Sequence, residues 1–130
     1  LLHGYSNKTR DIRLETDIED IEAVIDTAIP CGLILNKLVS NCFKHAFPEG
    51  RPGSVRIRLS RVDPLTLELV FSDDGVGVTP DFEYRKQNSL GFQTIVGLAE
   101  HQLQGHAAFE GGNGVTWQIR FSDQLYAARV

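Results

Sequence analysis

The sequence contains no methionine and only two cysteines, one tryptophan and five prolines among its 130 residues. Because even position 1 is not methionine, we expect it to be a piece of a longer polypeptide. No apolar run approaches the ~20 residues of a membrane-spanning helix, and the start, LLHGYSNKTRD, has no signal-like pattern. We therefore expect no direct membrane contact and no secretion through this segment, and a cytoplasmic location whether or not the parent protein is membrane-anchored.

Basic residues are fewer than acidic residues. Lysine and arginine number 13 against 17 acidic residues, which gives a formal net charge of -4. A nucleic-acid backbone is bound through clustered positive charge, so this balance disfavours a nucleic-acid partner.

Cysteine chemistry is equally limited. Cys31 and Cys42 lie eleven residues apart in one predicted helix, so their backbones would be ~16 Å apart and could not be bridged. Without a CxxC pair or Cys/His ligand spacing, the sequence predicts buried cytosolic thiols and no zinc site.

The hydrophobic residues, 42% of the total, are enough for the core of one domain over residues 1–130. Apolar residues repeat with helical period at 31, 34, 35, 38, 42 and 46, which predicts a helix with Pro30 in its first turn and an end at Pro48. A second helical pattern runs over 90–104 with Gly105 as its stop.

Period-two alternation predicts the strands. A hairpin covers 54–71, two further strands flank the glycines at 111–114, and residues 10–26 contain one or two short strands. The expected fold is therefore α+β, a two-layer α/β sandwich with a mostly antiparallel mixed sheet covered by helices on one face.

The first predicted helix carries a polar face of Lys37, Ser40, Asn41 and Lys44 at i, i+3, i+4 and i+7. A solvated helix face would explain this spacing. The alternative is a ligand site, because an asparagine oxygen can ligate Mg²⁺ and a lysine can bind phosphate oxygens. His45 borders this face, either as a structural residue or with its ring against a base.

The stretch DDGVG follows a predicted strand directly. Asp73 is the candidate acceptor for an exocyclic amine, while Gly75 and Gly77 let the backbone approach a ligand, although Asp-Gly pairs also mark simple turns. The polar stretch that follows predicts a lid at 79–89, with Arg85 and Lys86 available for phosphate and ordering expected upon nucleotide binding.

In their order along the chain, these motifs resemble those of the ATP-binding (catalytic) domain of bacterial sensor histidine kinases, in the ATPase superfamily shared with gyrase B, Hsp90 and MutL. NKLVSNCFKHAF is similar to that family's N box, FSDDGVGV to its G1 box, and SLGFQTIVGLAEHQLQG to its G2 region. The similarity extends from about residue 10 to residue 121, over most of the chain.

This resemblance implies ATP and Mg²⁺ as cofactors and a role for each matched residue. Asn41 would ligate Mg²⁺, and Lys44 would contact phosphates. His45 would pack on adenine, and Asp73 would accept a hydrogen bond from the adenine amine.

The resemblance also implies roles for residues of the two glycine motifs. Gly75 and Gly77 would give the base room, and Gly91 with Phe92 would close on the phosphates.

The resemblance also implies partners. The phosphoryl group would pass to a histidine on a dimerisation domain of the same protein and then to an aspartate of a response regulator in a two-component system. No histidine of this chain lies in the phosphoacceptor context.

Three features depart from the family pattern. Lys37 occupies a position commonly filled by glutamate, Val115 replaces a threonine, and the lid lacks the aromatic-rich box of longer-lid relatives. Two alternatives therefore stay open: a degenerate nucleotide-binding or interaction module, and a serine kinase of the anti-sigma type.

Overall fold

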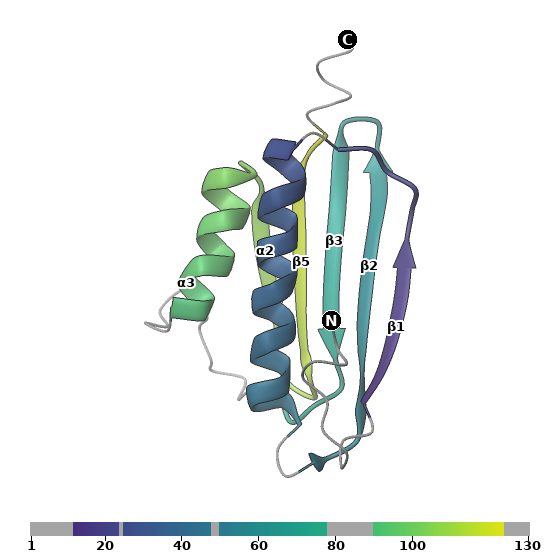
Figure 1. The fold of residues 1–130 in the computed structure, drawn as a ribbon, viewed down its shortest axis with the longest axis vertical. Helices are drawn as coiled ribbons and strands as arrows, with labels where there is room; N and C mark the ends of the chain where they lie inside the picture. The colour runs from purple at the N-terminus through teal and green to yellow at the C-terminus, as the bar shows by residue number, and fades with distance from the viewer. Residues whose placement is uncertain (1–11, 24, 48–49, 78–89, 124–130) are drawn as a thin grey trace.

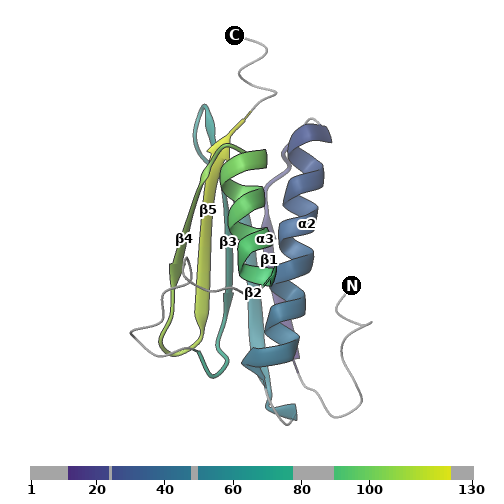
Figure 2. The same ribbon diagram turned by 90° about the vertical axis from the view of Figure 1, so that its left-hand side faces the viewer.

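The computed structural model describes residues 12–23, 25–47, 50–77 and 90–123, which form a sheet with helices on one of its faces (Figures 1 and 2). Along the chain these elements are β1 (Ile12–Ile18), α2 (Ile25–Asn41) with the π-helical turn η1 (Cys42–Ala46), β2 (Gly53–Asp63), β3 (Thr66–Asp73), α3 (Leu90–Gly97) with the π-helical turn η4 (Leu98–Gln102), β4 (His106–Glu110) and β5 (Val115–Ser122).

The described strands form one sheet in the order β1-β2-β3-β5-β4. β1 pairs with β2 in parallel, and the other neighbours are antiparallel. This mixed sheet under a helical layer confirms the predicted α+β class, the predicted hairpin and the strand pair after the second helix.

The core lies between the sheet and the helices. Alternate residues of the central strands point into it, because successive side chains of a strand face opposite sides. Its buried members from the two helical segments include Ile34, Leu38, Ile95 and Ala99. The helical periodicity seen in the sequence thus corresponds to one buried stripe on each helix.

Within the described residues, no helix covers the opposite face of the sheet (Figure 2). Glu68 is buried there on β3, where its Oε2 accepts hydrogen bonds from Gln118 Nε2 at 2.7 Å and Arg120 Nε at 2.8 Å. Because a buried carboxylate is costly without partners, these two β5 side chains stabilise the charged form of Glu68.

The first helix begins earlier than the sequence indicated. α2 starts at Ile25, so Pro30 lies inside the helix, and the prediction of a first-turn proline was wrong. Pro30 has no N–H to donate to Asp26, one helical turn earlier. Burial of Thr27 and Pro30 on the same face as Ile34 favours helix over this turn despite the lost bond.

The second helical segment ends close to the predicted stop at Gly105. The residue with positive φ is Gln104, at 52°, and not Gly105. Gly105 N–H donates to the Ala99 carbonyl at 2.8 Å, which completes the helix end in the predicted place.

Cys31 and Cys42 form no disulfide, as the sequence predicted. Cys42 is buried, and burial raises the pKa of the half-buried Cys31 thiol to about 11. Among the described residues, no helix is long and apolar enough to cross a membrane.

Candidate functional site

Three segments that are distant in the sequence meet at one end of the helical layer. They are the end of α2 with η1, the loop that follows β3, and the start of α3. These are the segments that carry the three sequence motifs, so the tertiary structure brings the motifs together.

Asn41 and Gly91 are direct neighbours. A Cβ atom on Gly91 would lie 3.1 Å from both Oδ1 and Nδ2 of Asn41, tighter than ordinary van der Waals contact. Asn41 is only partly exposed at the last residue of α2, and Gly91 is the second residue of α3. The absence of a side chain at Gly91 therefore leaves the Asn41 carboxamide beside the N-terminus of α3, where backbone N–H groups lack helical acceptors.

The loop after β3 packs against η1. Val76 N–H donates to the Ala46 carbonyl at 2.9 Å, and a Cβ on Gly75 would overlap that same carbonyl oxygen. Gly77 has a φ of +72°, where L side chains are strained, and a Cβ there would overlap the carbonyl oxygen of Gly112. The two glycines thus allow the loop to fit between η1 and the β4–β5 turn.

Asp73 ends β3 beneath this loop. Its Oδ1 accepts a hydrogen bond from Gly75 N–H at 2.9 Å. Burial raises the pKa of Asp73 above its ordinary value, although hydrogen bonds from the backbone N–H groups of Gly75 and Val115 act in the opposite direction. The carboxyl group is therefore partly withdrawn from water, where a hydrogen bond from a ligand N–H is stronger than at an open surface.

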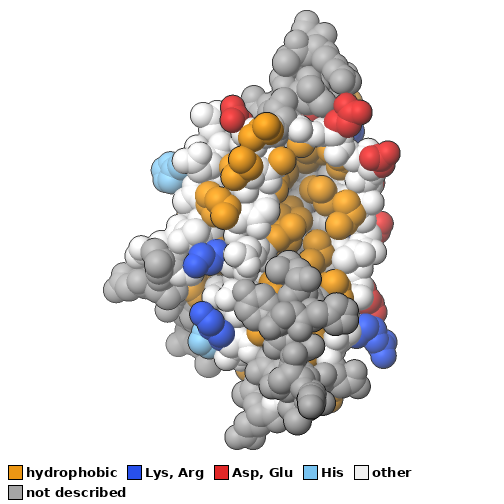
Figure 3. All heavy atoms as spheres, viewed as in Figure 1, with side chains coloured by type: hydrophobic (Ala, Val, Ile, Leu, Met, Phe, Trp, Pro, Cys, Tyr) orange, Lys and Arg blue, Asp and Glu red, His pale blue; other side chains and the backbone are white. Residues whose placement is uncertain are grey.

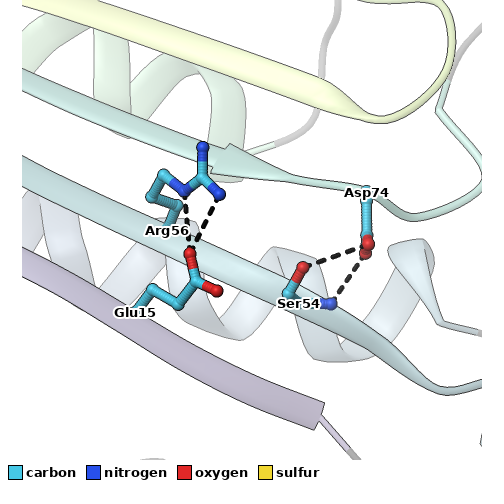
Figure 4. A network of polar contacts seen from close by, with 4 residues as sticks. All are labelled: Glu15, Ser54, Arg56 and Asp74. Atoms are coloured by element: carbon cyan, nitrogen blue, oxygen red, sulfur yellow. Dashed lines mark hydrogen bonds and ion pairs between the residues drawn. The ribbon is translucent and has the colours of Figure 1, made fainter.

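Asp74 is a residue whose role the sequence analysis missed. Its Oδ1 accepts from Ser54 N–H at 2.7 Å and its Oδ2 from Ser54 Oγ at 3.0 Å, so it joins the loop to the start of β2 (Figure 4). On the neighbouring strand pair, Arg56 and Glu15 form an ion pair at 2.9 Å. The two adjacent aspartates therefore differ in position: Asp74 bonds the loop to β2, and Asp73 lies beneath the loop.

The Asp74 contacts predict a pH-dependent stability. The Ser54 backbone N–H, with its hydroxyl group, holds the pKa of Asp74 below the ordinary value of 3.8. A carboxylate with a lowered pKa stabilises the fold above its unfolded pKa and loses this contribution as the pH falls through the folded value. We expect Asp74→Asn to lower the free energy of unfolding at pH 7 by about 1 kcal/mol or less, because the bonds are solvent-exposed.

Urea denaturation at pH 7 and pH 3 measures this effect, with the exposed residue Asp20 replaced by asparagine as the matched control. The deficit of Asp74→Asn should shrink at pH 3. A deficit that stays constant between the two pH values would contradict the assignment of the stabilising charge to Asp74.

The other residues of the N-box segment vary in exposure. Lys44 and His45 are exposed in η1, and Lys37 is partly exposed one turn before Asn41. The predicted ligand contacts of Arg85 and Lys86, and the predicted lid, lie outside the described residues.

Phe92 lies within the aromatic packing of the core. Its ring centroid is 5.8 Å from that of Trp117 and 6.0 Å from that of Phe109, and the Phe109 and Trp117 rings meet edge to face at 5.1 Å. These contacts anchor the first turn of α3 to β4 and β5. A contact of Phe92 with phosphate would accordingly come from its backbone N–H.

Among the residues that the structure describes, no group of three or more His, Cys, Asp or Glu side chains is placed to hold a metal ion. Mg²⁺ bound to nucleotides usually needs only one or two protein oxygens, because phosphates and water complete its coordination. The Asn41 carboxamide at a helix end fits such a nucleotide-bound ion, whereas a dedicated protein cage does not fit the described residues.

No protein-family model matches the chain. A sensor histidine kinase from Mycobacterium tuberculosis, PdtaS, is 37% identical over 81 residues, which are 62% of this chain and 16% of the relative. Blue-light-activated histidine kinase 2 from Erythrobacter litoralis is 25% identical over 108 residues, 83% of this chain and 31% of the relative.

The histidine kinase domain of an Erythrobacter litoralis blue-light-activated histidine kinase superimposes with a TM-score of 0.83 at 21% identity, over 97% of this chain and 57% of that chain. This chain is a histidine kinase relative, with the fold of a histidine kinase catalytic domain.

The superposition covers 97% of this chain and so includes the segments that form the site. The chain spans about a sixth to a third of the length of these curated relatives. The geometry of Asn41, Gly91 and Asp73 is therefore compared with only part of each relative.

Proposed function

We propose that this kinase domain binds ATP with Mg²⁺ and donates the γ-phosphoryl group to a histidine on a dimerisation domain of the same protein, from which a response regulator receives it. The observation that supports this most directly is the contact of Asn41 with Gly91. It places a neutral oxygen ligand beside a helix N-terminus, and that combination suits a metal-bound phosphate chain.

The adenine end of the nucleotide would lie over the loop after β3. Asp73 would accept a hydrogen bond from the exocyclic amine, and its partly buried setting favours that bond over one with water. Gly75 and Gly77 carry no side chains that could block the base. The exposed His45 ring would pack on the base from the η1 side.

The phosphate end would lie between η1 and the start of α3. Lys44 supplies positive charge, and the first backbone N–H groups of α3, including that of Phe92, supply donors. Mg²⁺ held by Asn41 and the phosphates would neutralise charge on the transferring group. Arg85 and Lys86 remain candidates for further phosphate contacts.

The transfer itself needs positioning more than acid–base chemistry. An imidazole nitrogen of the acceptor histidine attacks the γ-phosphorus, the bond from phosphorus to the β–γ bridging oxygen breaks, and ADP leaves. This chain would hold the nucleotide in line with the acceptor and stabilise the charge on the leaving phosphate. No protein base is required for that step.

A direct test uses the longer native protein with labelled ATP and Mg²⁺. Asn41→Ala should abolish Mg²⁺-dependent nucleotide binding and histidine phosphorylation together, while Gln102→Ala, at an exposed position of η4, should change neither. Acid-labile, base-stable phosphoprotein identifies the histidine product. Base-labile phosphoserine would instead favour the serine kinase alternative.

Lys37 gives a separate prediction, because it precedes Asn41 by one helical turn where related ATPases commonly carry a water-activating glutamate. A protonated lysine can neutralise phosphate charge but cannot accept a proton from water. We therefore expect very slow ATP hydrolysis by the isolated domain and preserved phosphorylation of an added dimerisation domain. A coupled ADP-release assay measures the first and radiolabel transfer the second.

Lys37→Glu distinguishes this prediction from a degenerate site, in which Lys37 repels Mg²⁺ and Val115 removes a supporting hydroxyl group. If the substitution creates Mg²⁺-dependent ATP binding that the wild type lacks, the site is degenerate. Lys37→Gln, which removes the charge without adding a base, is the matched control. Rapid hydrolysis by the wild-type domain would contradict both interpretations.

A further inference from the structure

The N-terminal half of α2 presents a row of large aliphatic side chains to solvent. Ile25, Ile29 and Leu33 are 71%, 58% and 48% exposed, and they follow one another at intervals of four residues. Such a row spans about 12 Å along the helix axis. Rows of i, i+4 side chains are the ridges that fit into the groove of a second helix in the commonest mode of helix packing.

β1 continues the apolar surface at the edge of the sheet. Leu14 is 43% exposed and Ile18 is 57% exposed. They pair in register with Val55 and Leu59 of β2, so their side chains lie on the face of the sheet that carries the helices. Figure 3 shows hydrophobic side chains gathered over the upper part of α2 and in the space between α2 and β1. We call the five exposed large aliphatic residues on these two elements (Leu14, Ile18, Ile25, Ile29 and Leu33) the α2–β1 surface.

Acidic residues predominate around the upper part of this surface. From residue 14 to residue 36 the sequence contains no lysine or arginine and six acidic residues. Asp20 and Asp26 among them are exposed, whereas Glu15 and Asp17 lie on the other face of β1, where Glu15 pairs with Arg56. Acidic side chains border the apolar patch along its upper and right edges in Figure 3. A partner that covers this patch would gain from lysine or arginine beside its own apolar stripe.

We propose that the α2–β1 surface is a docking site for an amphipathic α-helix whose apolar stripe is flanked by lysine and arginine. The aliphatic row of α2 supplies the ridge, Leu14 and Ile18 widen the contact, and the acidic border selects the charge of the partner. An exposed apolar patch of this kind, rimmed by polar residues, is typical of an interaction site.

This surface is separate from the nucleotide site. The aliphatic row ends at Leu33, eight residues and about 12 Å along the helix axis before Asn41. Docking and nucleotide binding can therefore succeed or fail independently in experiments.

The probe is a synthetic 18-residue helical peptide of leucine and lysine, with leucine at i, i+3, i+4 and i+7. One control peptide has glutamate in place of every lysine, and another has the leucine–lysine composition in scrambled order. Fluorescence anisotropy of labelled peptide at physiological ionic strength gives Kd for the native protein and its variants.

We expect the leucine–lysine helix to bind with at least tenfold higher affinity than either control peptide. Ile29→Gln should weaken it at least tenfold, because Ile29 is the centre of the row. Asp26→Lys should weaken it several-fold and reduce the salt dependence. Leu65→Gln on the β2–β3 turn and Glu110→Lys on β4 are matched controls outside this surface, and they should leave Kd unchanged.

Three results would overturn the proposal. The first is equal binding of the scrambled or glutamate peptide. The second is an equal loss of affinity in Ile29→Gln and Leu65→Gln, with both variants shown to be folded by their melting curves. The third is a concentration-dependent dimer of the native protein that Ile29→Gln abolishes in sedimentation equilibrium, because a second copy would then be the occupant.

Discussion

Asp73→Asn is expected to weaken ATP binding by about 10- to 150-fold, or about 1.5–3 kcal/mol. The asparagine retains the size of the side chain and one acceptor oxygen, but it loses the charge and can turn its NH₂ group towards the adenine amine. Burial of Asp73 strengthens the effect, because the mispaired amide has less access to water than at an open surface. Isothermal titration calorimetry with Mg²⁺-ATP measures the change.

Discrimination between nucleotides provides the decisive comparison. The wild type should bind ATP much more tightly than GTP, which presents a carbonyl group where ATP presents an amine. Asp74→Asn is the matched control, because Asp74 bonds to Ser54, and it should retain the preference for ATP. Equal affinity of the wild type for ATP and GTP would show that Asp73 does not read the base.

Gly75→Ala should lower the free energy of unfolding by about 2–4 kcal/mol. The added Cβ would overlap the Ala46 carbonyl oxygen, so the loop would have to move away from η1 and give up the bond from Val76 N–H to that oxygen. The estimate combines overpacking of a buried position with the loss of one backbone hydrogen bond. Chemical denaturation followed by circular dichroism gives the value.

Gly32→Ala is the matched control, since a Cβ at this exposed position of α2 has no atom within 4 Å. It should stabilise the protein by about 0.5–1 kcal/mol, because alanine favours helix over glycine. The two glycine-to-alanine changes are thus expected to have opposite signs. A neutral Gly75→Ala variant would mean that the loop does not pack on η1 in solution.

Much of the fold was predictable from periodicity, because each element has one buried face. The period-two alternation around Val55 and Ile57 identified β2, and the 3.6-residue pattern around Ile34 and Leu38 identified α2. Both patterns reflect which side chains become buried on folding. The start of α2 was not predictable in this way. Proline usually marks a first turn, and here packing of Thr27 and Pro30 outweighed that preference.

The candidate site was likewise predictable only in part. Residue chemistry in the sequence singled out Asn41 and Asp73, but their ligand contacts remain predictions. Asp74 was missed because its partner, Ser54, lies twenty residues away across the β2–β3 hairpin. Only the antiparallel register of β2 and β3 brings Ser54 near the loop, and register depends on the packing of both strands.

The sequence by itself determined the secondary-structure types, the one-sided burial of sheet and helices, and the set of residue types available for phosphate, Mg²⁺ and adenine. These properties follow from local periodicity and side-chain chemistry, which a linear chain already contains. The tertiary structure decided which of these residues meet. It placed Gly91 against Asn41, docked Gly75 on Ala46 and left Ile25, Ile29 and Leu33 exposed beside β1. Such contacts depend on how separate elements pack, because residues far apart in sequence become neighbours only when a shared core fixes their relative positions.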